Sequence, residues 1–175
     1  SSLAQGELCL AGASPPAFAL HRSLHLTPSM ALEATSALTL KGAKLAVEAG
    51  VAEATKLGFK VSVAVVDAGG TLLALLRMDG SMPASAEIAT GKAKTATMFA
   101  RETKLLEGAV NGDKSNGTER TALLSSGYIL MEGGVPIIVG GKIVGACGVS
   151  GVKPAEDAAV AKAAAESVTK PAASL

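Results

Sequence analysis

The sequence contains no tryptophan, a single tyrosine and three phenylalanines, so aromatic residues make up only 2% of its 175 residues. Proteins that bind single-stranded nucleic acid stack the bases on aromatic side chains, and this chain has few to offer. Its formal net charge of +1, without a run of lysine or arginine, also provides no basic surface for a phosphate backbone. Nucleic acid is therefore not an expected partner.

Cysteine and histidine each occur only twice. Cys9 and Cys147 do not form a disulfide framework, their spacing fits no zinc motif, and we expect Cys147 to be a small core residue. His21 and His25 would lie on one face of a short helix, at positions i and i+4. Such a pair is able to ligate a metal or haem iron, although two histidines in a terminal segment without a nearby carboxylate or thiolate are more often simply solvated.

Long apolar runs are missing as well. Hydrophobic residues make up 49% of the chain, yet no stretch approaches the roughly 20 uninterrupted apolar residues that a membrane-spanning helix needs. Much of the apolar content is alanine and glycine, which suggests closely packed helices and a buried subunit interface. We expect a soluble protein with one folded domain, because no Pro/Ser-rich linker divides the chain.

The first 36 residues differ in composition from the remainder. They hold both histidines and Arg22, and their only acids are Glu7 and Glu33. This composition is typical of a leader or flexible segment and resembles the remnant of an organelle transit sequence. We therefore divide the chain into a leader, residues 1–36, and a domain, residues 37–175. An organelle (plastid or mitochondrion) and secretion after leader removal both stay open as locations.

Periodicity and turn residues predict the regular elements of the domain. Helices are predicted over residues 39–57, 84–100, 101–108 and 154–168. Strands are predicted in two pairs, 59–67 with 71–78 and 136–139 with 143–149, and residues 128–131 as a short strand or an extended entry to the second pair. Gly140 and Gly141 supply the positive φ angles of a type I′ turn, and Asp67 is expected to cap its own turn rather than to be catalytic.

The helix predicted over residues 84–100 has a mixed face. Ile88, Lys92, Thr95 and Phe99 share it, so that a lysine and a threonine interrupt an apolar stripe. A ligand with carboxylates would satisfy Lys92 and Arg77, and the hydroxyl of Thr95 would reach its centre. The spacing is equally consistent with Lys92 extending to solvent and Thr95 bonding back into its helix.

Five runs in this order resemble the GlcG/HbpS family, which includes the C-terminal domain of the PduO corrinoid adenosyltransferases. They are residues 65–70, 76–80, 92–96, 132–137 and 145–151. The resemblance covers about residues 39–168 and leaves out the leader. It implies an α/β (α+β) fold, a profilin-like three-layer α/β/α arrangement with an antiparallel sheet, and assembly into homo-oligomers, often octamers.

The resemblance also implies haem binding, with haem degradation proposed for some members and corrinoid-related roles for others. Thr95 matches a threonine that approaches the haem iron, and a hydroxyl would be a weak ligand. Residues 39–168 contain no histidine. An imidazole ligand would therefore have to come from His21 or His25, of the same or a neighbouring subunit.

The leading prediction is a haem-binding protein that sequesters or senses haem, or a related tetrapyrrole, in a homo-oligomer. The predicted site consists of Arg77 and Lys92 facing the propionates, Thr95 near the iron, Met78, Met98 and Phe99 as an apolar wall, and Gly133 and Gly134 allowing close approach. The alternative is a haem-degrading enzyme, or a corrinoid or other small-molecule activity in the same pocket; it ranks second because no catalytic triad or carboxylate pair appears. A structural oligomer without a cofactor is the third possibility.

Overall fold

The computed structural model describes residues 34–112 and 120–169, and the compact unit of the chain begins at Thr35. His21, His25 and most of the predicted leader lie outside the described residues. The elements, in chain order, are α1 (Leu40–Lys56), β1 (Ser62–Asp67), β2 (Leu72–Arg77), α2 (Ser85–Met98), α3 (Thr103–Asn111), the 3-10 helix η2 (Thr121–Ser125), β3 (Gly134–Val139), β4 (Lys142–Ser150) and α4 (Pro154–Thr169).

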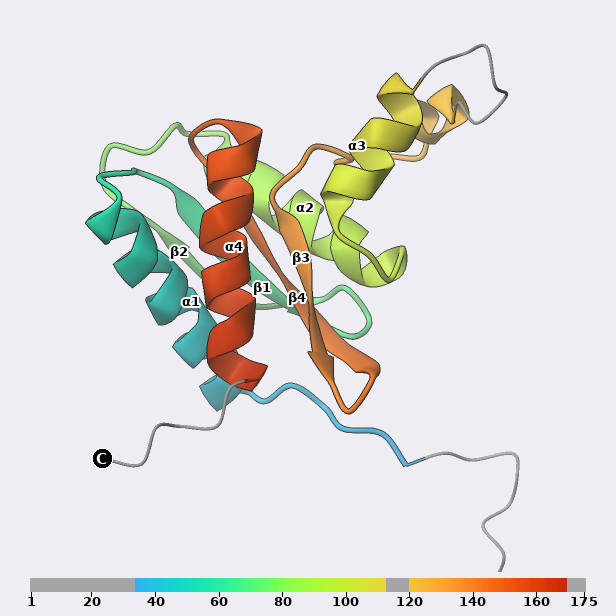
Figure 1. Ribbon diagram of the computed structural model, residues 1–175. Coiled ribbons are helices and arrows are strands. Elements are labelled where there is room, and N and C mark those ends of the chain that lie inside the picture. Colours follow the sequence, from blue (N-terminus) through green and yellow to red (C-terminus); the bar gives the residue numbers. More distant parts are fainter. Residues whose placement is uncertain (1–33, 113–119, 170–175) are drawn as a thin grey trace, which may run out of the picture. The chain divides into compact units, whose positions relative to one another are not determined.

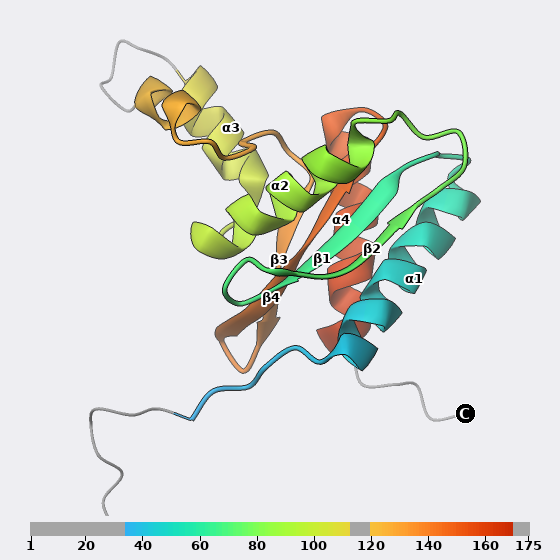
Figure 2. The same cartoon turned by 180° about the vertical axis from the view of Figure 1, so that it is seen from behind.

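The strands form one antiparallel sheet in the order β2-β1-β4-β3. Helices α1 and α4 pack side by side on one face, and α2 covers the other (Figure 1, Figure 2). The central strand β1 is therefore buried on both sides, and Val63 through Val66 have no exposed surface. The predicted α+β class and the α/β/α layering with an antiparallel sheet are confirmed.

Local signals account for most element boundaries. Thr39 caps α1 by accepting a hydrogen bond from the backbone N–H of Gly42 (3.2 Å). Asp67 Oδ1 accepts from the N–H groups of Gly69 and Thr71 at 2.8 and 2.9 Å, which confirms its predicted role as a turn cap. Gly140 and Gly141 have φ angles of 58° and 78°, as the predicted turn between β3 and β4 requires.

Small residues allow the layers to approach closely. Gly50 of α1 packs against Val63 of β1 and Ala164 of α4, and much of the buried surface of α1 and α4 is alanine. On the opposite face, a Cβ at Gly148 of β4 would overlap the carbonyl oxygen of Ala89 in α2. The alanine and glycine content of the sequence thus reflects closely packed helices, as predicted.

Of the two alternatives for residues 128–131, the structure has the entry segment and not a strand, because residues 128–130 are irregular and lead from η2 towards β3. The helix η2 was not predicted. Ser85, the first residue of α2, is of a type that often caps helices, but it makes no capping hydrogen bond; its hydroxyl lies 2.7 Å from that of Ser62, inside the structure. Its partner is on another element, and a local sequence pattern does not identify such a partner.

Candidate functional site

Lys92 and Asp157 form an ion pair in the interior. Lys92 Nζ lies 2.8 Å from Asp157 Oδ2 and donates a second hydrogen bond to the carbonyl oxygen of Val149 at 3.1 Å. The lysine side chain is 0% exposed and the aspartate 2%. The pair connects α2, β4 and the first turn of α4, so the lysine neither reaches solvent nor points into an open pocket.

Gly133 and Gly134 make room for this pair. Gly133 has a φ of 124°, and a Cβ there would lie 2.8 Å from Lys92 Nζ and 2.9 Å from the Cβ of Asp157. The N–H of Gly134 donates to Thr103 Oγ1 at 2.8 Å, and a Cβ on Gly134 would lie 2.7 Å from Thr103 Cγ2. The groups that approach these glycines closely in this fold are therefore side chains and the backbone of Lys92 and Val149, all of the protein itself.

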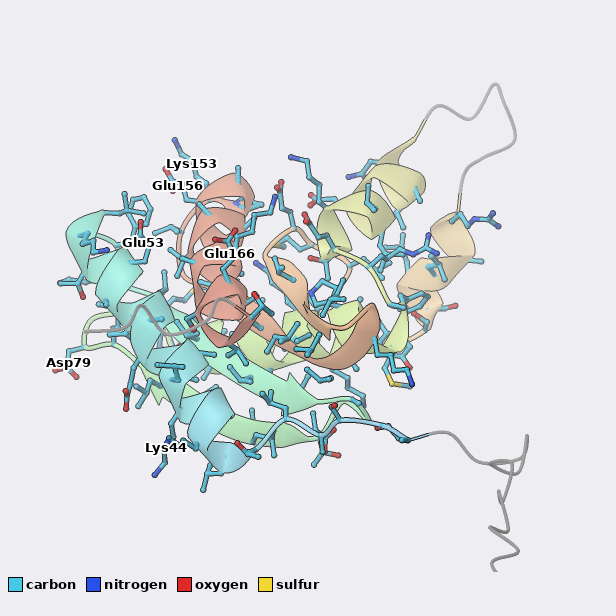
Figure 3. The ribbon with its side chains drawn as sticks, turned by 60° about the horizontal axis from the view of Figure 1, so that its bottom comes forward. Lys44, Glu53, Asp79, Lys153, Glu156 and Glu166 are labelled. Atoms are coloured by element: carbon cyan, nitrogen blue, oxygen red, sulfur yellow. The ribbon has the colours of Figure 1, made fainter. Side chains whose placement is uncertain are left out.

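The surroundings of Asp157 shift the pKa of its carboxyl group. Burial raises the pKa of this carboxyl group, while the hydrogen bond and charge of Lys92 and the N–H of Val152, which donates to Oδ1 at 3.2 Å, oppose the shift. At the same helix start, the N–H of Lys153 donates a hydrogen bond to Glu156 Oε2 at 3.1 Å. Both residues lie at the N-terminal end of α4 (Figure 3). Only Asp157 of this acidic turn faces inward.

Thr95 is also fully buried. Its hydroxyl donates to the carbonyl oxygen of Gly91, one turn earlier in α2, at 2.8 Å. This back-bonding is one of the two alternatives that the sequence left open. Ligation of iron by Thr95 would use a lone pair of the oxygen, which this hydrogen bond leaves free. It would require the residues that cover the hydroxyl to move, so the assignment stays a prediction.

The remaining predicted site residues lie at opposite ends of α2. Arg77 is exposed beside the start of the helix, where it donates to the carbonyl oxygen of Ser81 at 3.1 Å, and Met78 packs against the core. Met98 and Phe99 lie at the other end. The 14 residues of α2 separate the two groups by about 20 Å at 1.5 Å per residue. One copy of the chain does not bring all the predicted residues together.

Phe99 leads to a surface hollow that the sequence analysis did not identify. Its ring makes an edge-to-face contact with Tyr128, with centroids 5.1 Å apart and planes at 84°. Tyr128 lines a hollow of about 300 Å³, which we call the Tyr128 hollow. Helix α3 contributes Glu107, Val110 and Asn111 to it, η2 contributes Leu124, and the next segment contributes residues 128–131. Its lining is mostly apolar, as is usual for small-molecule sites.

The available side chains determine where haem iron could be ligated. Haem iron is held in proteins by His, Cys, Met or Tyr. The described residues include no histidine, and Cys147 is buried, which raises the pKa of its thiol to about 12 and keeps it protonated. Tyr128 and the partly exposed Met131 both line the Tyr128 hollow. Its donor set therefore fits a tetrapyrrole iron.

Within the described residues, no group of three or more His, Cys, Asp or Glu side chains is arranged to hold a metal ion. No helix of the same part of the chain is long and apolar enough to cross a membrane. Tyr128 is the single tyrosine of the chain and belongs to none of the predicted site motifs. The signal that marks it is its edge contact with Phe99, which is visible only once the chain is folded.

Two comparisons with known proteins point to the same family. The family described as "Haem degrading protein HbpS-like" matches residues 38–166. Protein GlcG of Escherichia coli (strain K12) is 48% identical to this chain over 114 residues, which are 65% of this chain and 81% of GlcG. These matches confirm the resemblance seen in the sequence.

Solved structures agree with this result. A double mutant of HbpS from Streptomyces reticuli is 32% identical and superposes with a TM-score of 0.69, covering 89% of this chain and 97% of HbpS. PduOC, solved as a complex with haem, is 27% identical with a TM-score of 0.66, covering 75% of this chain and 95% of PduOC. The α+β architecture is thus shared with a relative that was crystallised with haem.

Proposed function

Because this chain belongs to the HbpS-like family of haem-degrading proteins, we propose that it binds haem and acts by sequestering or sensing it. The observation that carries the proposal is the Tyr128 hollow, an apolar surface site that holds two side chains of types that ligate haem iron. The haem complex of the relative PduOC supports the same ligand class. A corrinoid is the less favoured tetrapyrrole.

The residues around the hollow suggest how haem would be held. Val110 and Leu124 offer apolar surface to the porphyrin. The exposed Arg101 follows Phe99 in the chain and donates one hydrogen bond, from Nε to the carbonyl oxygen of Phe99 at 3.2 Å. Its other N–H donors are suited to a propionate. Bound haem would supply an iron centre able to exchange ligands or electrons.

Haemin titration of the full chain tests the proposal. We expect a shifted Soret band that saturates at one haem per chain. Leu124→Asp places a charge in the hollow, and the lost apolar contact should weaken binding about tenfold or more. Leu57→Asp, at the end of α1, is the matched control at another exposed leucine and should bind as the wild type does. A wild-type chain that leaves the Soret band unshifted would refute haem binding.

Haem degradation is the second candidate, and the family description favours it. It differs from sequestration in its product. If the protein degrades haem, the Soret band should fall in the presence of peroxide and a defined product should be released faster than from free haemin. Bleaching at the rate of free haemin, without a defined product, would leave sequestration or sensing as the function.

We further propose a homo-oligomer, with α1 and β2 at the contact. Strand β2 pairs with β1 and, in the part of the chain that the structure describes, with no other strand. Leu40 and Leu45 of α1 and Leu72 and Leu76 of β2 are each about half exposed. Large apolar side chains exposed on two neighbouring elements favour an interface, and an edge strand is able to pair with a second copy.

The charges of α1 favour a second copy as the partner. Lys44, which points outward from the helix (Figure 3), and Glu48 both line the groove between α1 and β2. In a two-fold contact the lysine of one copy is able to face the glutamate of the other. Light scattering should give a multiple of the 17.2 kDa chain mass, eightfold for an octamer. The variant Leu72→Glu/Leu76→Glu should have a lower mass, and a monomeric wild type would contradict the proposal.

A further inference from the structure

The Tyr128 hydroxyl is directed to no partner within the fold. Tyr128 is half-buried, yet its hydroxyl makes no hydrogen bond to any residue in the described ranges 34–112 and 120–169. Buried or half-buried tyrosines usually find a partner for this group. Glu107, the carboxylate that lines the same hollow, accepts a hydrogen bond from the N–H of Glu132 at 2.7 Å. The tyrosine oxygen and the amide of Asn111 are thus the polar groups that the hollow offers to a ligand, and of these two only the phenolic oxygen is a usual ligand of haem iron.

The ring of Tyr128 contacts Phe99, and the segment that carries it is anchored to α2. The edge contact with Phe99 ties it to the end of α2. The next residue, Ile129, packs so tightly on Gly91 of α2 that a Cβ at position 91 would overlap the isoleucine Cγ1. Leu130 is also buried, at 7% exposure. The segment is therefore anchored to α2, and the tyrosine is preorganised rather than free to swing.

We propose that Tyr128 is the axial iron ligand of haem bound in the Tyr128 hollow, an inference that rests on the proposed function. Tyrosine is one of the side chains that ligate haem iron, and ferric iron suits an anionic oxygen better than the thioether of Met131. Ligation forms a bond from ferric iron to the phenolic oxygen and breaks the O–H bond, and the proton leaves to water. The oxidation state of the iron does not change.

This assignment differs from the ligands expected from the sequence. It requires neither His21 nor His25, and it leaves the fully buried Thr95 covered as it is in the fold. It also accounts for the use of Phe99, which was predicted as an apolar wall and contacts the proposed ligand directly. Haem would then lie at the end of α2 and beside α3, away from the buried Lys92.

Replacement of Tyr128 by phenylalanine tests the proposal, because it removes the oxygen and keeps the ring against Phe99. We expect the ferric Soret and charge-transfer bands to move, and the dissociation constant for haemin to rise by about tenfold or more, which corresponds to a loss of at least 1.4 kcal/mol. Metal-free protoporphyrin should bind the wild type and Tyr128→Phe equally, since it has no iron to ligate. A thermal melt checks that the variant is folded.

Control variants separate the competing ligands. His21→Ala/His25→Ala should keep the wild-type bands and affinity. Met131→Leu changes the lining of the hollow, so only the position of its ferric bands, which reports the iron ligand, is compared, and that position should stay as in the wild type. If Tyr128→Phe also keeps the wild-type bands and affinity, the ligand assignment is wrong while haem binding stands. If the bands change only in His21→Ala/His25→Ala, the leader supplies the ligand and the assignment is again wrong. If wild-type protein binds no haemin at all, the proposed function and the ligand assignment fail together.

Discussion

Replacing Lys92 by methionine is expected to lower the free energy of unfolding by about 3–5 kcal/mol, the usual cost of removing one partner from a buried ion pair. Asp157 would keep the hydrogen bond from Val152 but lose the ammonium group 2.8 Å away, at a position where its side chain is 2% exposed. Urea denaturation of the wild type and Lys92→Met measures the difference. The loss would be large relative to the total stability of an ordinary domain.

Two further variants show whether the pair itself is responsible. In Lys92→Met/Asp157→Leu no charge is left uncompensated, so much of the lost stability should return. Lys56→Met removes the lysine of the exposed pair with Glu53, where Lys56 is 72% exposed, and should cost less than about 1 kcal/mol. If Lys92→Met is as mild as Lys56→Met, the buried pair does not have the energetic role assigned to it here.

The elements that were predicted well depend on neighbours in the sequence. The helix from Thr39 to Leu57 follows from apolar spacing and a capping hydroxyl, and the structure confirms it as α1. The Asp67 turn and the Gly140-Gly141 turn likewise depend on residues within a few positions. The family resemblance added the layer order, which local patterns alone do not provide. The fold was therefore largely predictable.

The candidate site was less predictable because its partners are distant in the chain. Lys92 and Asp157 are 65 positions apart, and Asp157 lies in the first turn of a helix, where acids are common because of the helix dipole. Helical periodicity indicated that Lys92 and Thr95 share a face of α2. It did not indicate whether that face meets a ligand or the sheet, and the structure shows that it is buried within the fold.

The Tyr128 hollow was also difficult to predict from the sequence. Phe99 belongs to the predicted apolar wall, whereas Tyr128, 29 positions later in the sequence, belongs to no predicted site. Their contact depends on η2 and on the irregular segment after it, neither of which has a clear periodic signal. A site built on irregular segments is a common arrangement for binding surfaces, and sequence periodicity detects it poorly.

Substitution of Gly148 by alanine should be as damaging to the fold as the loss of Lys92. An added Cβ would overlap the carbonyl oxygen of Ala89 and lie 2.5 Å from the backbone nitrogen of Ala93. Both are backbone atoms of α2, so no side chain is able to rotate away and the helix must move off the sheet. We expect a loss of about 3 kcal/mol, at the upper end of overpacking costs, and a Tm lower by roughly ten degrees.

Gly108→Ala in α3 is the matched control, because a Cβ there would meet no atom within 4 Å. At this exposed helical position alanine should raise stability by about 0.5–1 kcal/mol. The opposite signs of the two changes separate steric overlap from any general effect of adding a methyl group. Because Phe99 follows the end of α2 and contacts Tyr128, a displaced helix should also weaken haemin binding in Gly148→Ala. A Gly148→Ala protein with wild-type Tm would show that α2 does not pack on β4 as closely as described.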